Sequence, residues 1–542
     1  MKRIVSAAAI AICLLLPAAA RADEAACPRP APGSDVQRPP DLYSQNGRLD
    51  VTMDYLAQVD SAGRNLFCFV TKDGLESPTL HVNPGDTLHI KLTNLVPPKF
   101  GAAMRMPAMR MPKDVCGDAE MTPTSVNMHF HGTNTSPRCH SDEVIRTLIN
   151  SGRSFEYTLH IPKDEPPGLY WYHPHVHGIS SPTVQGGATG ALEVEGIADI
   201  QPAVAGLPER YLVLRDQRLV QLTNPPSGGA YLPMPFWDVS VNYVPVPWPQ
   251  YPPSIVRMQT GSKEFWRVVN AGANTIMDIK LVYDGAAQPL QIVAFDGVPT
   301  GSKDGHHQGT IVTQDHILLP PSARAEFIVA APSSSSVKAM LETEAIDGGP
   351  LSDSNPRRPL VQIVASDAPP ALPGMPAPKG AWPHTRFEDL ADAKVTAKRG
   401  LYFDEVSPPN ARDKEGASFF ITVDGQDEEV YDPDNPPAIT TTQGSVEEWT
   451  IENHTKEVHD FHIHQIHFLV EAVNGVAIPK EQQQLYDVFQ VPYYTGQGDY
   501  PSIKIKLDFR GPDTGDFVYH CHILDHEDRG MMAIIRVRPR HS

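Results

Sequence analysis

Positive charge, long apolar runs and extended helical periodicity are all scarce in this sequence of 542 residues. Lys and Arg total 45 against 64 Asp and Glu, and the formal net charge of -19 disfavours a nucleic-acid partner because phosphates would be repelled. Beyond the N-terminal segment, no stretch is long and apolar enough to span a bilayer. The 54 prolines and 39 glycines favour short strands and turns, so we predict an all-β fold of antiparallel sandwiches.

The N-terminal residues have the features of a secretion signal. Lys2 and Arg3 precede an apolar run, and small residues suited to cleavage end at Ala22. We therefore predict that residues 1–22 are a signal peptide and that the protein is exported. The periplasm is the expected location, with the extracellular space as the alternative.

Cysteine is also rare, with six residues in the whole chain. Cys13 lies in the predicted signal peptide, and Cys521 lies in a histidine-rich motif described below. The other four are an even number in a chain expected to reach an oxidising compartment, which predicts up to two disulfides. Three pairings remain open among Cys27, Cys68, Cys116 and Cys139.

Three segments share a turn glycine, an alternating strand and an asparagine at the same spacing. They are Gly85–Asn94, Gly261–Asn270 and Gly444–Asn453. A single match would mean little, but three evenly separated copies predict one β domain used three times. The predicted boundaries are 45–198, 205–367 and 396–542, with a Pro/Ala-rich linker at 368–395.

A second repeat links only the first and last of these domains. Gly168–His175 and Gly515–His522 have a glycine, a tyrosine and two histidines at the same spacing. Pro174 in the first copy replaces Cys521 in the second. The first domain therefore keeps the paired histidines and lacks the thiol.

The histidines of this repeat suggest metal binding. Alternate residues of a strand face opposite sides, so Cys521 can bind one metal while His520 and His522 bind others. A thiolate, imidazoles and a methionine such as Met531 form the ligand set of a blue-copper site. One His-x-His pair is more often solvated or structural, but paired clusters in two repeated domains favour copper. The clusters are His129 with His131, His173 with His175, His459 with His462 and His464, and His520 with His522 and His526.

With these motifs the sequence resembles the multicopper oxidases over nearly all of the chain after residue 22. The resemblance includes the runs Asp296–Pro299 and Leu318–Glu326. It implies three consecutive cupredoxin-like Greek-key β-sandwich domains and four copper ions, with a three-copper cluster between the first and third domains. The implied type 1 ligands are His459, Cys521, His526 and Met531; the type 2 ligands are His129 and His462; the type 3 ligands are His131, His173, His175, His464, His520 and His522.

The resemblance also implies a proton relay. Asp142 and Glu527 match the positions of acids in similar enzymes, although either could be a solvated or turn carboxylate. The type 1 ligand expected near the surface, where it would receive the electron, is His459. Asp460 and Gln465 depart from the proline and glycine frequent in the family, and Asp487 receives no role.

Three further histidines lie close to the motifs without a place in the ligand set. They are His140, His177 and His467. We expect them to be surface groups or groups that support the ligands.

The implied activity couples one-electron oxidation of a reducing substrate to four-electron reduction of O2 to water. Phenols and aromatic amines are the expected substrates, as for laccases. The alternative is oxidation of cuprous or another metal ion, because thioethers suit cuprous ion and methionines crowd one segment. These are Met104, Met106, Met109, Met111 and Met121, with Arg105 and Arg110 between them. The arginines would repel a cation. A loop in which these methionines only pack as adaptable apolar side chains explains the segment at least as well as copper binding. A copper-sequestering protein without turnover is the alternative of another class.

Overall fold

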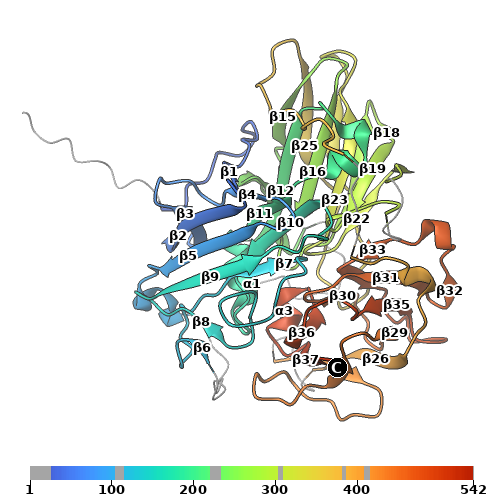
Figure 1. The fold of residues 1–542 in the computed structure, drawn as a ribbon. Coiled ribbons are helices and arrows are strands. Elements are labelled where there is room, and N and C mark those ends of the chain that lie inside the picture. Colours follow the sequence, from blue (N-terminus) through green and yellow to red (C-terminus); the bar gives the residue numbers. More distant parts are fainter. Residues whose placement is uncertain are drawn as a thin grey trace, which may run out of the picture.

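A computed structural model describes residues 26–103, 115–219, 234–302, 309–380, 386–407 and 416–540. The predicted signal peptide and the methionines from Met104 to Met111 lie outside this part of the chain. The described residues form three successive pairs of β-sheets, seen in Figure 1 in blue, green-yellow and orange-red, which confirms the predicted all-β class. Among them, no helix has the length and apolar character needed to cross a membrane.

The first sandwich occupies residues 41–194. Its five-stranded sheet contains, in spatial order, β1 (Asp41–Tyr43), β4 (Thr79–Val82), β11 (Gly190–Val194), β10 (Gly168–His173) and β7 (His129–His131). The facing sheet contains β3 (Asn65–Thr71), β2 (Arg48–Val59), β5 (Thr87–Asn94) and β9 (Ser154–His160), and β6 (Cys116–Gly117) pairs with β8 (Thr147–Leu148).

The second sandwich occupies residues 209–366. One sheet contains β14 (Val244–Val246), β13 (Trp237–Val241), β12 (Glu209–Arg218), β16 (Lys263–Asn270), β23 (Arg324–Ala330), β19 (Leu290–Phe295), β20 (Val298–Pro299) and β21 (Val312–Gln314). The other contains β15 (Ser254–Gln259), β25 (Arg358–Ser366), β24 (Ala339–Thr343), β17 (Met277–Tyr283), β18 (Ala286–Gln288) and β22 (Ile317–Leu319).

The third sandwich occupies residues 397–538. One sheet contains β27 (Ser418–Val423), β26 (Ala397–Val406), β29 (Val446–Asn453), β35 (Ser502–Asp508), β31 (Phe468–Val473), β32 (Val476–Ala477) and β33 (Leu485–Tyr486). The other contains β28 (Ile439–Thr442), β37 (Met532–Arg538), β36 (Gly515–Cys521), β30 (His459–Ile463) and β34 (Val488–Val491).

The helices are short and lie between strands. The α-helices are α1 (Ser180–Gln185), α2 (Ile197–Ile200) and α3 (Leu524–Glu527), and the 3-10 helices are η1 (Pro98–Ala103), η2 (Pro202–Val204), η3 (Leu390–Asp392) and η4 (Lys480–Gln482). Helices α1 and α3 contact each other, and they join the first and third sandwiches side by side in the lower half of Figure 1.

The repeated asparagine has the same structural role in all three sandwiches. Asn94, Asn270 and Asn453 end β5, β16 and β29 and are fully buried. Each side-chain amide donates hydrogen bonds to two or more backbone carbonyl oxygens, and each side-chain oxygen accepts one from the backbone two residues later. A buried amide with all its hydrogen bonds made fixes the loop that follows the strand. The sequence repeat is therefore a structural repeat.

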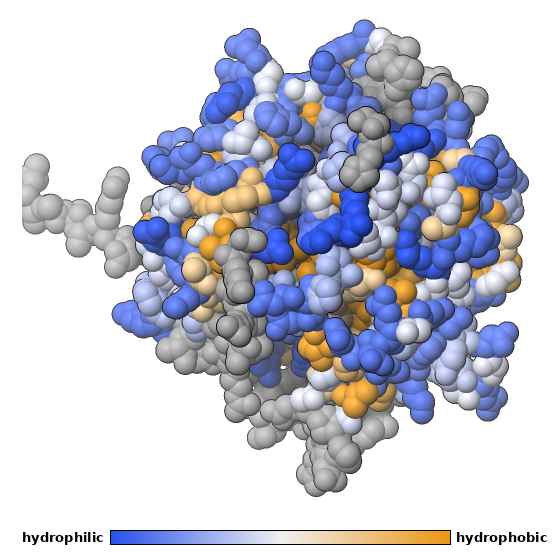
Figure 2. Space-filling view, turned by 60° about the horizontal axis from the view of Figure 1, so that its bottom comes forward, coloured by the Kyte–Doolittle hydropathy of each residue, from blue (hydrophilic) through white to orange (hydrophobic). Residues whose placement is uncertain are grey.

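Two disulfides fix the first sandwich. Cys27 bonds to Cys68 of β3, and Cys116 of β6 bonds to Cys139, which resolves the three open pairings. Cys521 is the free cysteine of the described residues. The face at the bottom of Figure 1 is mostly hydrophilic, with hydrophobic side chains in small separate groups (Figure 2), as the net charge of -19 suggests.

Candidate metal centre

Strand β36 places Cys521 against two histidines of the same sandwich. Its Sγ lies 3.6 Å from His459 Nδ1 and 3.8 Å from His526 Nδ1, and the two nitrogens are 3.1 Å apart. Met531 is fully buried, and its carbonyl accepts a hydrogen bond from Cys521 N at 3.0 Å. The structure thus brings together the predicted type 1 residues, with three ligand atoms around a common point.

Burial makes the thiolate of Cys521 unfavourable unless a cation is bound. Desolvation raises the pKa of the Cys521 thiol well above its ordinary value. The thiolate is the metal-binding form, so a cation must compensate its charge in this apolar surrounding. Asp460 N also donates to Cys521 Sγ at 3.4 Å, a hydrogen bond that the proline frequent in the family could not make.

On the other side of β36 lies a group of eight buried histidines. Cross-strand pairing sets their positions: His173 of β10 pairs with His129 of β7, and His520 of β36 pairs with His462 of β30. The first and third sandwiches therefore present the same paired arrangement toward each other. The group is His129, His131, His173, His175, His462, His464, His520 and His522.

The free ring nitrogens of this group fit metal ions. His520 Nε2 lies 3.3 Å from His175 Nε2 and 3.2 Å from His464 Nε2. Seven other buried ring nitrogens have no hydrogen-bond partner among the described residues: His129 Nε2, His131 Nδ1, His173 Nε2, His462 Nε2, His464 Nδ1, and His522 Nδ1 and Nε2. Such unpaired buried atoms are costly unless a ligand satisfies them.

The histidines also have the protonation state that metal binding requires. Desolvation by burial lowers the pKa of His175 to about 3 and of His520 to about 4. The same cause lowers the pKa values of His131, His173, His462, His464 and His522 well below the ordinary value. Neutral imidazole is the metal ligand, so these seven histidines can bind a metal ion without first losing a proton.

Hydrogen bonds at the opposite ring nitrogens orient these histidines. His173 Nδ1 donates to Pro174 O at 2.9 Å, and His520 Nδ1 donates to Cys521 O at 2.9 Å. His462 Nδ1 donates to Asp487 O at 2.6 Å. A hydrogen bond of this kind fixes the tautomer and leaves the other nitrogen for the metal.

The two acids predicted for the proton relay both lie beside the histidine group. Asp142 Oδ1 accepts hydrogen bonds from His129 Nδ1 and Phe130 N, each at 3.0 Å, and Asp142 Oδ2 accepts one from Gln465 Nε2 at 2.7 Å. Gln465 occupies the left-handed region with φ of 62°, which explains why glycine suits this position. Glu527 is fully buried, and its Oε1 lies 3.4 Å from His177 Nδ1.

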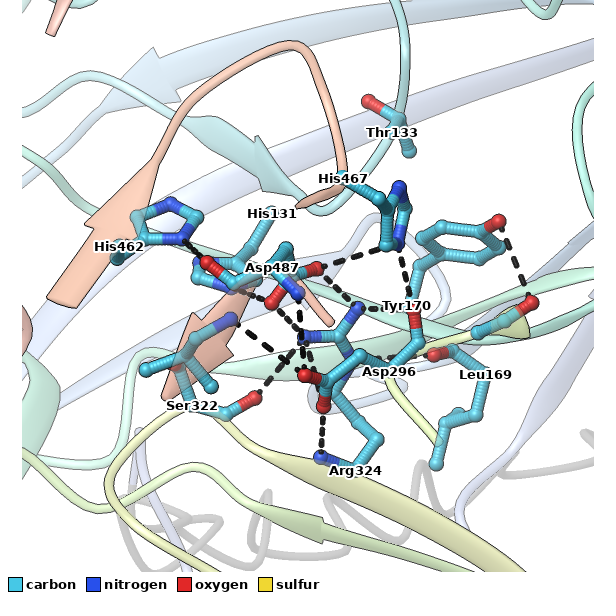
Figure 3. Close-up of polar contacts among 12 residues, drawn as sticks. His131, Thr133, Leu169, Tyr170, Asp296, Ser322, Arg324, His462, His467 and Asp487 are labelled. Atoms are coloured by element: carbon cyan, nitrogen blue, oxygen red, sulfur yellow. Dashed lines mark hydrogen bonds and ion pairs between the residues drawn. The ribbon is translucent and has the colours of Figure 1, made fainter. Parts of the chain in front are cut away.

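Asp487 is the supporting residue that the sequence did not reveal. It accepts hydrogen bonds from His131 Nε2 at 3.1 Å and from Arg324 Nη1 at 2.7 Å. Figure 3 shows Asp487 between the guanidinium of Arg324 and the rings of His131 and His462. His467 donates to Asp296 O at 2.8 Å in the same network. All three sandwiches therefore contribute to one buried network, and the two runs that resemble the family in the second sandwich supply Asp296 and Arg324.

One detail differs from the sequence expectations. His526 is 4% exposed while His459 is fully buried, so the type 1 residue nearer the surface is His526 and the expectation for His459 was wrong. The cause is their location, since His526 lies in α3 at the edge of the sandwich and His459 lies in β30 within a sheet. Of the three additional histidines, His140 is exposed, and His177 and His467 are buried beside the histidine group.

One Cys/His site and a larger histidine site between two sandwiches are the arrangement expected of a protein that binds several metal ions. Two sequence models described as "Multicopper oxidase" match residues 118–198 and 407–541. The matched segments lie in the first and third sandwiches, which therefore belong to the multicopper oxidase family.

Relatives agree with this placement. The multicopper oxidase mco of Staphylococcus haemolyticus is 35% identical over 127 residues, which is 23% of this chain and 26% of the relative. The first curated relatives are thus matched over about a quarter of their length. The multicopper oxidase mco of Staphylococcus aureus is 23% identical over 85% of this chain and 82% of its own.

Solved structures extend the similarity in fold to more than nine tenths of the chain. The McoA multicopper oxidase 2F4 variant from Aquifex aeolicus has a TM-score of 0.65 and 17% identity, over 93% of this chain and 99% of its own. The laccase-like multi-copper oxidase CueO from Ochrobactrum sp. has a TM-score of 0.62 and 19% identity, over 93% of this chain and 100% of its own. These matches confirm the three cupredoxin-like sandwiches predicted from the sequence.

Proposed function

We propose that this protein is a copper-dependent oxidase that couples one-electron oxidation of phenols or aromatic amines to the four-electron reduction of O2 to water. The observation that carries the proposal is the end of strand β36, where Cys521 faces one site while His520 and His522, the residue after the strand, face the other. Bound copper supplies the redox chemistry at both sites. Four copper ions would be held: a type 1 ion by His459, Cys521, His526 and Met531; a type 2 ion by His129 and His462; and a type 3 pair by His131, His173, His175, His464, His520 and His522.

The protein's own part in this function is to hold the ligands rigid, join the two sites and supply protons. The peptide links from Cys521 to its two neighbours give electrons a short covalent route. Burial of the histidines excludes bulk water from the site where O2 would be reduced. Asp142, which contacts His129, and Glu527, beside His177, are our candidates for passing protons to that site.

Aromatic substrates are favoured by likeness to the Ochrobactrum protein, which is described as active towards lignin model compounds and lignosulfonate. Oxidation of a metal ion is the second candidate. Met121 and Met532 line one cavity together with His177, and two thioethers with an imidazole suit cuprous ion.

Oxygen consumption tests these proposals. Copper-loaded protein should take up O2 with 2,6-dimethoxyphenol, and Cys521→Ser should abolish the uptake while the chain stays folded. Parallel runs with cuprous, ferrous and manganous ions decide between the two substrate classes. Stable copper binding without O2 uptake from any donor would contradict the oxidase proposal and favour sequestration.

We also propose that the protein acts after export, in the periplasm or else outside the cell. The N-terminal pattern of residues 1–22 supports this location. Fractionation of cells that express the full chain tests it, with mass spectrometry of the mature N-terminus. A cytoplasmic protein that retains Met1 would contradict it.

A further inference from the structure

A stack of aromatic rings lies on the surface of the third sandwich. The ring of His454 is sandwiched between Tyr402, at 4.5 Å between centroids, and Tyr500, at 3.8 Å, with interplanar angles of 9° and 29°. Tyr494 packs against Tyr500 at 4.6 Å. Tyr500 is 42% exposed and the other three are partly exposed. The stack therefore presents aromatic surface to solvent.

This stack is linked directly to the Cys/His site. His454 is followed by the buried Thr455, whose Oγ1 lies 2.9 Å from His459 Nε2. His459 Nδ1 faces Cys521, so the ring hydrogen lies on Nε2. His459 Nε2 then donates a hydrogen bond to Thr455 Oγ1. Tyr494 N donates to Thr455 O at 2.8 Å. One residue and one hydrogen bond thus separate the surface stack from a ring at the metal site.

Negative charge beside the stack favours some aromatic molecules over others. Glu452 Oε2 lies 3.1 Å from His454 Nε2, and Glu428 Oε1 lies 3.4 Å from the hydroxyl of Tyr402. Both carboxylates belong to a chain with a formal net charge of -19. Aromatic faces attract cations, and an acidic surrounding repels anions. Neutral or cationic aromatic molecules therefore suit this surface.

We infer that the exposed face of Tyr500 is the docking site for a neutral or cationic aromatic electron donor, whose electron reaches the metal site through His454, Thr455 and His459. This inference rests on the proposed oxidase function. The donor would lose one electron and then release a proton to solvent, and a copper ion held by Cys521, His459 and His526 would accept the electron. The tyrosines are not oxidised as intermediates, because the electron tunnels through them. Donors thus need no direct contact with His526, which is only 4% exposed.

The first sandwich offers a matched control for the stack. Tyr43 of β1 stacks on His81 at 4.1 Å and 23°, and Tyr43 is 50% exposed. Strand β1 lies at the opposite edge of its sheet from β7, which carries the metal-site histidines. Tyr43→Leu therefore removes an equivalent exposed ring far from the metal site.

Binding of phenyltrimethylammonium, an aromatic cation that donates no electron, tests the docking site on the copper-loaded protein. Tyr500→Leu should weaken binding measured by calorimetry about threefold to tenfold, the range expected for loss of one aromatic contact. Tyr43→Leu should bind like the unaltered protein. Equal affinities for Tyr500→Leu and Tyr43→Leu would overturn the docking site.

Anaerobic loss of the blue absorption tests the electron route. Reduction by N,N-dimethyl-p-phenylenediamine should slow at least tenfold in Tyr500→Leu and in His454→Leu, while reduction by ferrous ion stays unchanged in both. Unchanged reduction by the amine would overturn the route. If no donor bleaches any variant, the oxidase function itself fails, and the binding experiment alone then judges the docking site.

Discussion

Asp487 is the residue through which the second sandwich acts on the metal site. It binds the buried guanidinium of Arg324 on one side and His131 on the other. Neither partner is near it in sequence, so each is recognisable only in the folded chain. Substitution at this position should therefore affect stability and metal occupancy together.

Asp487→Asn should lower the free energy of unfolding by about 3 kcal/mol, because it leaves the buried charge of Arg324 without its strongest partner. It should also reduce copper content, since His131 loses the group that orients it. Urea denaturation and metal analysis measure both effects. Asp50→Asn, at an exposed pair with Arg48, is the matched control and should change neither. If the two variants have the same free energy of unfolding, the charge of Asp487 does not stabilise the fold.

Asp142→Asn tests the proton relay at the residue scale. The amide can still accept a hydrogen bond from His129 Nδ1, but it no longer exchanges a proton at neutral pH. The blue absorption should remain, and the rate of O2 reduction should fall about 100-fold, as expected for loss of general acid catalysis. Single-turnover reoxidation measures this rate. Reoxidation as fast as in the unaltered protein would exclude Asp142 from proton delivery.

At the scale of elements, strands β7, β10, β30 and β36 were the most predictable part of the site. Their His-x-His spacing follows from the two-residue period of a strand, and the repeat showed which pairs correspond. The solvent exposure of the type 1 histidines was less predictable. The side chains that bury His459, such as Phe403 and Phe419, come from other strands. Arg324 was visible only as part of a family-like run and Asp487 received no role, because a linear sequence does not show which distant charges pair.

The Cys116–Cys139 disulfide makes an element-scale prediction. It closes a 23-residue segment that includes β7, and such a closure stabilises by about 3 kcal/mol in the chain-entropy estimate. The double substitution Cys116→Ser, Cys139→Ser should lower the free energy of unfolding by about that amount. Denaturation with and without a reducing agent measures it. The reductant should destabilise the unaltered protein, and a variant as stable as the oxidised protein would contradict the prediction.

At the scale of the whole molecule, a buried polar group connects the first and third sandwiches. Glu165 accepts a hydrogen bond from Asn134 Nδ2 at 2.9 Å. Arg386 donates to Asn134 O at 3.1 Å and forms an ion pair with Asp513. Desolvation raises the pKa of Glu165 to about 7, although the charge of Arg386 opposes this shift.

The raised pKa of Glu165 predicts that the free energy of unfolding falls as pH rises. Between about pH 4.5 and 7 the folded chain retains the proton of Glu165 while the unfolded chain has released it, so folding is favoured at the lower pH. The contribution lost across this window is about 3 kcal/mol. Glu165→Gln should flatten this part of the stability profile measured by urea denaturation, and Glu156→Gln at an exposed position should not. An unchanged slope in Glu165→Gln would show that Glu165 does not titrate in this range.

The histidine group draws on both halves of the chain, from His129 to His522, and this has a consequence for how the protein is made. A ribosome that has completed the first sandwich has synthesised only half of the histidine group. The Cys/His site is complete only after Cys521, His526 and Met531 near the C-terminus have been synthesised. Copper can therefore enter a complete site only after synthesis ends and the first and third sandwiches dock. Chains truncated before His520 lack part of the histidine group, so they cannot complete the site at which we propose that O2 is reduced.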